Sequence, residues 1–229
     1  MTSPGSPIAP EEVGHIPALS ALSLKERTSL TARLKRRTYL PNRLILKRGE
    51  KGDCMAFINW GSVKVRTTNS GSQEMVVALL SSGSYFGEIG MITSRPRSFD
   101  VMSLSKTEIF ELAREDFIAH TQTYRAFSLS LLVAVAGRLD DAGQRFKDLT
   151  EQHVPTRLLR VLTQLGTPYM IGPKQVLLID PRPSQYDLVG LVGASREKVY
   201  EALRDMERSG FVEVEKHRII VHPTPGFLL

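Results

Sequence analysis

The sequence predicts an α+β protein with an N-terminal antiparallel β-roll, one long helix and a C-terminal winged helix-turn-helix. Three observations predict this fold class. Short β-type runs alternate with glycines over residues 36–112, an apolar period of three to four residues runs over 124–149, and two short helices and two alternating strands follow over 184–222. The 229 residues, 41% hydrophobic and 24% charged, are ordinary for a folded chain of one large domain or two small ones.

The cysteine content and the lengths of the apolar runs indicate the cellular compartment of the protein. Cys54 is the single cysteine, so the chain alone forms no internal disulfide and holds no iron–sulfur cluster, which indicates a reducing cytosol. The first residues lack the basic and apolar regions of a signal peptide, and the longest apolar run, near residues 129–136, is too short to cross a bilayer. We therefore expect a cytoplasmic protein without a membrane partner.

The N-terminal half divides into an arm and a sensor domain. Residues 1–20 contain four of the 13 prolines and little periodicity, so we expect a mostly flexible arm. Residues 21–122 form the predicted β-roll, in which Val63 and Val65 alternate with polar neighbours and residues 69–72 (NSGS) favour a hairpin turn. Residues 21–50 carry a net charge of +7. This cluster either reaches bent DNA or is a solvated surface, and we favour the second.

A dimerisation helix is predicted over residues 123–150. Its apolar side chains recur at steps of three or four and no proline interrupts them, which is typical of a helix that packs along one narrow stripe. The stripe either meets the same helix of a second chain or packs on its own domain, and we favour the dimer. The predicted interface consists of Phe127, Leu131, Val135, Leu139, Ala142 and Phe146.

The third domain, residues 151–229, contains the winged helix-turn-helix. Ser184 with Asp187 is expected to begin a helix whose apolar side starts at Tyr186, and Gly193 to end it in a left-handed turn. Ser195 caps the second helix, which Gly210 ends. Residues 211–215 and 218–222 then alternate like the two strands of a wing.

The second of these helices has the size that fits the major groove of DNA. Arg196 can donate two hydrogen bonds to guanine and Glu197 can accept one from cytosine, whereas phosphate contacts only fix the register. The alternative is a solvated helix face, and residues 151–229 carry a net charge of only +1. The predicted DNA-binding residues are Ser184, Gln185, Ser195, Arg196, Glu197, Lys198, Tyr200 and Glu201.

Three motifs resemble one family. RGEKGDCMAFINWGSVKV, SGSYFGEIGMI followed by Arg97-Ser98, and LVGASREKV, in this order over residues 21–222, are similar to the Crp–Fnr superfamily of bacterial transcription factors. The resemblance implies a cyclic-nucleotide-binding-like roll. Arg97 would neutralise the phosphate, Ser98 would donate a hydroxyl hydrogen, and Glu88 would accept from the ribose. The implied effector-binding residues are Gly87, Glu88, Ile89, Arg97 and Ser98.

The chain departs from the family pattern at two places. Ala142 and Gly143 stand where cyclic AMP sensors carry hydroxyl side chains against the adenine, so the family's specificity for cyclic AMP does not carry over, and a different nucleotide or a ligand-independent state stays open. Glu201 replaces a second arginine of the recognition helix, so the operator should differ from the family's best-known site. A further alternative is that Glu88 and Arg97 pair with each other in an empty roll.

These observations predict a homodimeric, non-enzymatic transcription regulator that binds near-palindromic double-stranded DNA. A cyclic nucleotide or related nucleotide is the expected effector, and RNA polymerase is a candidate partner through a loop at residues 166–173. Two alternatives stay open: a ligand-independent regulator, and a nucleotide-binding regulatory subunit without DNA contact. A metal-dependent enzyme on the roll is disfavoured, because none of the five histidines lies within residues 36–112. No catalytic or metal site is predicted.

Overall fold

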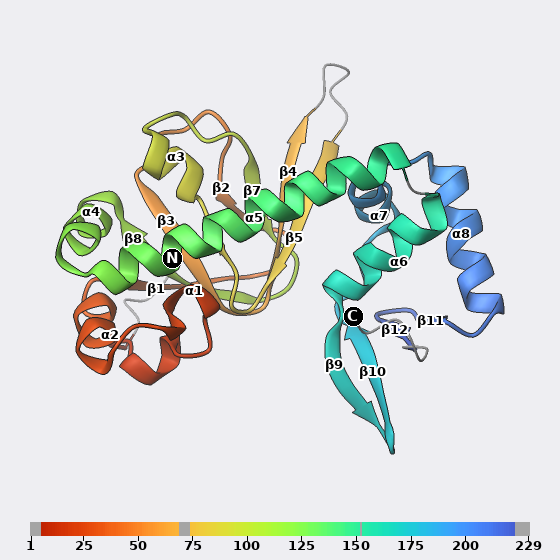
Figure 1. The fold of residues 1–229 in the computed structure, drawn as a ribbon, viewed down its shortest axis with the longest axis horizontal. Coiled ribbons are helices and arrows are strands. Elements are labelled where there is room, and N and C mark those ends of the chain that lie inside the picture. Colours follow the sequence, from red (N-terminus) through yellow and green to blue (C-terminus); the bar gives the residue numbers. More distant parts are fainter. Residues whose placement is uncertain (1–5, 69–73, 152, 223–229) are drawn as a thin grey trace. The chain divides into compact units, whose positions relative to one another are not determined.

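The structure, a computed structural model, describes residues 6–68, 74–151 and 153–222 (Figure 1). Its contacts divide the chain into two compact units, and the main boundary between them falls at residues 142 and 143, within the longest helix. Each unit has its own apolar core. The predicted fold class is confirmed.

The first unit contains a roll of two four-stranded antiparallel sheets, ordered β1-β8-β3-β6 and β2-β7-β4-β5. In the first sheet Phe57 lies opposite both Phe110 and Tyr85. The predicted turn at residues 69–72 lies outside the described residues. The strands are β1 (Lys35–Tyr39), β2 (Leu44–Leu46), β3 (Cys54–Trp60), β4 (Ser62–Thr68), β5 (Glu74–Ser81), β6 (Tyr85–Phe86), β7 (Asp100–Ser103) and β8 (Thr107–Ala113).

Strand β3 contributes to two separate apolar clusters. Because successive side chains of a strand point to opposite faces, Ala56 and Ile58 join one buried cluster while Met55 and Phe57 join the other. The first cluster is formed by the roll strands alone. The second lies between the roll and the surrounding helices.

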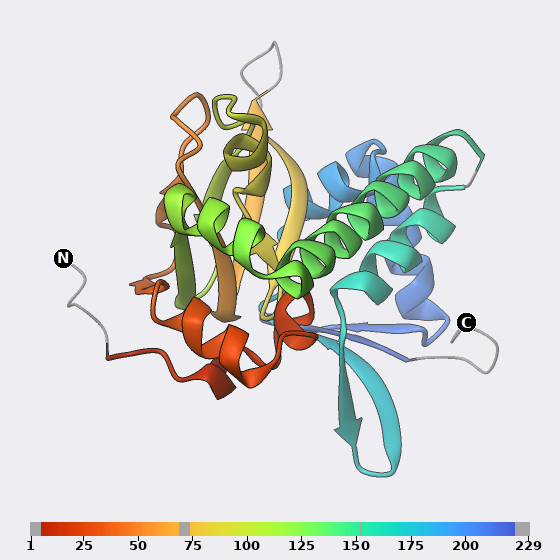
Figure 2. The same cartoon turned by 60° about the vertical axis from the view of Figure 1, so that its left-hand side comes forward.

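The N-terminal segment corrects one prediction. Residues 8–20 do not form a flexible arm: they contain η1 (Pro10–Val13) and α1 (Pro17–Ser20), and α2 (Leu24–Thr31) follows. Val13, Ile16 and Leu19 are fully buried in the second cluster. Pro10 and Pro17 begin the two short helices, which lie in the red part of the ribbon in Figure 2. Apolar side chains between the prolines supply the packing.

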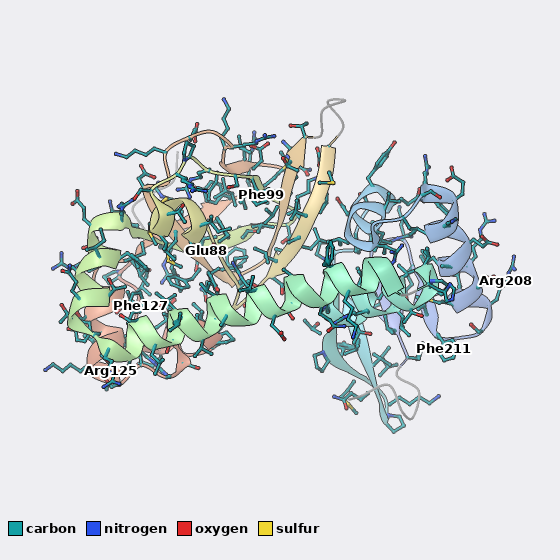
Figure 3. The ribbon with its side chains drawn as sticks, turned by 45° about the horizontal axis from the view of Figure 1, so that its top comes forward. Glu88, Phe99, Arg125, Phe127, Arg208 and Phe211 are labelled. Atoms are coloured by element: carbon teal, nitrogen blue, oxygen red, sulfur yellow. The ribbon has the colours of Figure 1, made fainter. Side chains whose placement is uncertain are left out.

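Helix α5 (Arg125–Glu151) follows α3 (Glu88–Thr93) and α4 (Arg114–Thr123). The predicted dimer interface is wrong at two positions, because Phe127 and Leu131 are buried in the core of their own chain (Figure 3 labels Phe127). Their spacing places them on the helix face that covers the roll unit. Val135, Leu139, Ala142 and Phe146 are exposed, as a partner surface requires.

The second unit packs helices on a four-stranded antiparallel sheet of order β11-β12-β10-β9. The predicted loop at residues 166–173 is wrong, because most of it forms strand β9, which pairs with β10 as a hairpin that turns at Gly172 (Figure 1). The elements are α6 (Val154–Leu165), β9 (Thr167–Ile171), β10 (Lys174–Ile179), α7 (Gln185–Val192), α8 (Arg196–Arg208), β11 (Val212–Val214) and β12 (Ile219–Val221).

Candidate functional site

The first site lies where the roll meets helix α3. Gly87 precedes this helix with φ of 85°, a left-handed conformation that favours glycine. A Cβ atom at Gly87 would lie 2.9 Å from Nη1 of Arg97 and 3.1 Å from the carbonyl oxygen of Cys54. Glycine is therefore required both by the backbone conformation and by the close approach of Arg97.

Arg97 is a buried cation held by backbone carbonyls. Its side chain is 5% exposed, Nη2 donates to the carbonyl oxygen of Cys54 at 2.9 Å, and Nη1 donates to that of Gly87 at 3.2 Å. The carboxylate of Asp53 is 3.5 Å away but 67% exposed, so it compensates this charge only partly. A buried guanidinium with these partners fits an incoming anionic group, as the resemblance implies for a phosphate.

Glu88 pairs with a residue that sequence reasoning missed. Its carboxylate, in a residue 8% exposed, accepts a 2.7 Å hydrogen bond from Nη1 of Arg138 on α5. The Arg138 guanidinium also lies 3.6 Å from the ring centroid of Tyr85 and donates to the Tyr85 carbonyl oxygen. The alternative in which Glu88 pairs with Arg97 is not what the structure shows. Arg138 follows Leu131 and Ala134 on the inward face of α5, a spacing that could have revealed it.

The remaining predicted effector residues line the surface beside this pair. Ile89 is 48% exposed and Ser98 is exposed, and they follow Glu88 and Arg97 directly in the chain. The hydroxyl of Tyr85 is buried without a hydrogen-bond partner among the described residues. Burial raises the pKa of the neighbouring Cys54 thiol to about 11, so the thiol beside Arg97 is neutral at physiological pH. A buried cation, an acceptor carboxylate and a glycine cradle together fit an anionic ligand that carries hydroxyl groups.

The second site is the helix pair α7–α8. The predicted caps are confirmed: the Asp187 carboxylate accepts from the Ser184 backbone N–H at 2.9 Å, the Asp187 N–H donates to Ser184 Oγ at 3.2 Å, and Ser195 Oγ accepts from the Lys198 N–H. Gly193 adopts φ of 64° between the helices, as its left-handed turn requires.

Helix α8 has one buried and one exposed face. Val199, Ala202, Leu203 and Met206 are buried against the unit. The opposite face forms a shallow groove that contains four of the predicted DNA-binding residues and three that were not predicted. Recurrence every four residues from Arg196 could have revealed two of them, Arg204 and Arg208 (Figure 3 labels Arg208). The lining residues are Arg196, Glu197, Tyr200, Glu201, Arg204, Asp205 and Arg208.

Ser184 and Gln185 line a different groove, between the start of α7 and the wing. Lys216 and His217 of the wing turn lie on its other side, and both are exposed. Arg182 fixes this arrangement, since its backbone N–H donates to the carbonyl oxygen of His217 at 2.7 Å and its Nη1 to that of Glu215 at 2.9 Å. Ser195 and Lys198 are exposed at the start of α8. The structure therefore divides the eight predicted DNA-binding residues among neighbouring surfaces of one unit.

Comparison with known proteins decides the family. Residues 36–124 match the model of the cyclic nucleotide-binding domain, and residues 156–226 match that of the Crp-like helix-turn-helix domain. The chain belongs to the Crp–Fnr superfamily. This membership confirms the family that the sequence motifs resemble.

Two relatives align with this chain over most of their length. The cyclic AMP receptor protein of Thermus thermophilus is 27% identical over 203 residues, which cover 86% of this chain and 88% of the relative. The cAMP-activated global transcriptional regulator Vfr of Pseudomonas aeruginosa is 27% identical over 207 residues, 88% of this chain and 95% of the relative. This Crp–Fnr protein is thus a transcription regulator with a cyclic nucleotide-binding domain and a helix-turn-helix domain.

Solved structures share the fold. The c-di-GMP-responsive regulator CLP of Xanthomonas campestris has a TM-score of 0.71 at 22% identity, covering 88% of this chain and all (100%) of that one. The catabolite activator protein of Thermus thermophilus has a TM-score of 0.54 at 27% identity, covering 90% of this chain and 93% of that one.

Across the described ranges of the Crp–Fnr protein, no helix has the length and apolar content needed to cross a membrane. The same residues contain no group of three or more His, Cys, Asp or Glu suited to a metal ion.

The basic segment at residues 21–50 is partly neutralised within the protein. Arg36 forms ion pairs with Glu12 at 2.8 Å and with Glu108 at 2.7 Å, and Arg37 pairs with Glu111 at 3.0 Å. These pairs tie strand β1 to its neighbours. They favour a structural surface over a second DNA contact.

Proposed function

We propose that the protein is a homodimer that acts in the cytoplasm, binds a near-palindromic DNA operator and responds to an anionic nucleotide in the roll. The observation that carries the DNA part is the exposed face of α8, whose arginines recur on the side opposite the buried stripe. Two-fold symmetry would place the two half-site centres about 34 Å apart, or one turn of DNA.

Base reading is assigned to the start of α8. Arg196 and Glu197, with Tyr200 and Glu201 on the next turn, line the exposed groove of this helix. Ser184, Gln185 and Lys198 contact phosphates and set the register, and Ser195 is exposed beside them at the start of α8. Arg196 is the residue best suited to guanine, because a guanidinium can donate two parallel hydrogen bonds to O6 and N7.

The effector site is assigned to Gly87, Glu88, Ile89, Arg97 and Ser98. Arg97 supplies the buried positive charge for a phosphate, and Glu88 supplies an acceptor for a ribose hydroxyl. Ala142 and Gly143 are exposed on α5 and offer no side-chain donor or acceptor to a base. We therefore favour a cyclic nucleotide or related nucleotide that is not selected through these two positions.

A ligand-independent regulator is the second candidate function. The observation that favours it is the 2.7 Å bond from Arg138 to Oε1 of Glu88, because the carboxylate that a ribose would use already has a charged partner inside the protein. Calorimetry with cyclic AMP, cyclic GMP and cyclic di-GMP separates the two candidates. Binding that is lost in Arg97→Ala supports the effector site, and absence of binding to the wild type supports the ligand-independent regulator.

The dimer interface is assigned to the exposed stripe of α5. Besides Val135, Leu139, Ala142 and Phe146, this stripe includes Leu129 and Leu132, which are 55% and 65% exposed. The partner is a second copy of this chain, since a helix of 27 residues with exposed apolar side chains along its length suits pairing with itself. RNA polymerase is the proposed partner of the β9–β10 hairpin, where Tyr169 and Met170 are 50% and 58% exposed.

Selection of operators from random duplexes tests the DNA-binding proposal. The wild type, alone or with each nucleotide, should enrich a near-palindromic sequence. Arg196→Ala should cost about 1–3 kcal/mol in operator affinity and relax the preference at one base pair of each half-site. Equal affinity for every duplex, with or without nucleotide, would refute the proposal.

A further inference from the structure

Tyr186 is an exposed aromatic residue at the start of α7. The sequence pattern assigned it to the apolar side of this helix, but its side chain is 74% exposed, while Leu188 and Val192 are 2% and 1% exposed. The correction has a simple reason. Tyr186 is the second residue of α7 and lies beyond the arc of the helix that packs on the core.

The ring of Tyr186 lies beside the residue proposed to read a base. The guanidinium carbon of Arg196 is 5.8 Å from the centroid of the Tyr186 ring, within the range of a cation–π contact. On the same guanidinium, Nη2 donates a 3.2 Å hydrogen bond to Oε1 of Gln185. The first residue of α8 is thus held by the first two residues of α7.

We propose that Tyr186 is a positioning residue for Arg196 in base recognition, an inference that rests on the proposed DNA-binding function. Arginine has a long side chain, and fixing it on the DNA loses rotamer freedom. Contacts already present in the free protein reduce that loss, because fewer conformations have to be given up on binding.

The two contacts leave the chemistry of base reading intact. An aromatic ring attracts a cation through its face, whereas the N–H donors of a guanidinium lie in the guanidinium plane. Gln185 accepts from one nitrogen, and a guanidinium carries five N–H donors, so a two-bond contact to guanine remains available. Tyr186 and Gln185 therefore restrict where Arg196 points without replacing the base as its partner.

The test measures base discrimination rather than affinity alone. The base pair read by Arg196 is first identified as the position whose preference Arg196→Ala loses. Discrimination is then the ratio of dissociation constants for the selected operator and for the operator changed at that position. We expect Tyr186→Ala to lower this ratio about two- to five-fold, which corresponds to an exposed cation–π contact. Tyr186→Phe, which keeps the ring, should retain the ratio.

Two controls separate positioning from a structural effect. In the Arg196→Ala background, Tyr186→Ala should cause no further change in discrimination at that base pair. Trp60→Ala removes the ring of another exposed cation–π pair, in which Lys106 lies 5.7 Å from the ring centroid, and should leave discrimination unchanged. Because Tyr186 is 74% exposed, its variants should unfold at the wild-type temperature.

Three results would overturn the inference. Full discrimination by Tyr186→Ala, equal weakening on all sequences, or a loss in Tyr186→Phe as large as in Tyr186→Ala would each show that the ring does not position Arg196. A wild type that discriminates no duplex would instead refute the proposed function itself. The two failures are therefore distinguishable.

Discussion

Arg138 of helix α5 donates a 2.7 Å hydrogen bond to Glu88 of helix α3, across 50 positions of the sequence. The pair joins the helix proposed for dimerisation to the residue proposed to accept a hydrogen bond from the ribose hydroxyl. A ligand hydroxyl that donates to Glu88 would therefore share this carboxylate with Arg138. Because a ligand shifts a conformational equilibrium only through its different affinities for the two states, a ligand that binds differently when Arg138 is in place would connect the roll to α5 through this shared carboxylate.

The Arg138–Glu88 pair should contribute measurably to stability. Arg138→Gln leaves the Glu88 carboxylate, 8% exposed, without its charged partner, and we expect a loss of about 1–3 kcal/mol in the free energy of unfolding. Urea unfolding of the two single variants and of Arg138→Gln/Glu88→Gln measures the coupling. Additive losses in the double variant would show that the two residues do not interact.

Two leucines of α5, one buried and one exposed, should respond differently to substitution by a charged residue. Leu139 is 74% exposed, so Leu139→Asp should give a folded monomer in light scattering. Leu131 is 6% exposed within the core, so Leu131→Asp should instead unfold the roll unit, because it buries an unpaired charge. A folded Leu139→Asp dimer would contradict the proposed interface.

The N-terminal segment should behave as part of the core. Ile16 is fully buried, and Ile16→Ala should lower the free energy of unfolding by about 2–5 kcal/mol. Leu24 is 66% exposed and provides the matched control. Leu24→Ala should change the free energy of unfolding, measured in urea, by less than about 0.5 kcal/mol. If both variants changed the free energy of unfolding equally and only slightly, residues 8–20 would be a flexible arm after all.

Cys54 should make stability fall at alkaline pH. Burial raises the pKa of its thiol in the folded state from its usual value near 9.0 to about 11, although Arg97 opposes this shift. The folded state therefore holds the proton more tightly than the unfolded chain, and its stability decreases as the pH rises from 9 towards 11. Cys54→Ser should unfold with a shallower pH dependence over this interval. Slow alkylation of the native wild type at pH 8 would agree with a neutral thiol.

Local signals were sufficient for much of the site. The caps at Ser184 and Ser195 and the left-handed turn at Gly193 were predicted correctly, because each depends on a few consecutive residues. Gly87, before α3, was located instead by the resemblance of motifs, and the close approach of Arg97 explains why a glycine stands there. Exposure was harder to predict, since a period of three to four residues marks an apolar stripe but not the surface that covers it.

The sequence by itself determined the order of the domains, the β-roll, the helix-turn-helix and the family. These follow from periodicity, turn residues and caps, which act over short distances along the chain. Only the tertiary structure decided that Phe127 and Leu131 are core residues, that residues 8–20 are packed, and that Arg138 holds Glu88. Those outcomes depend on contacts between residues far apart in the chain, and many different partners would have satisfied the same local pattern.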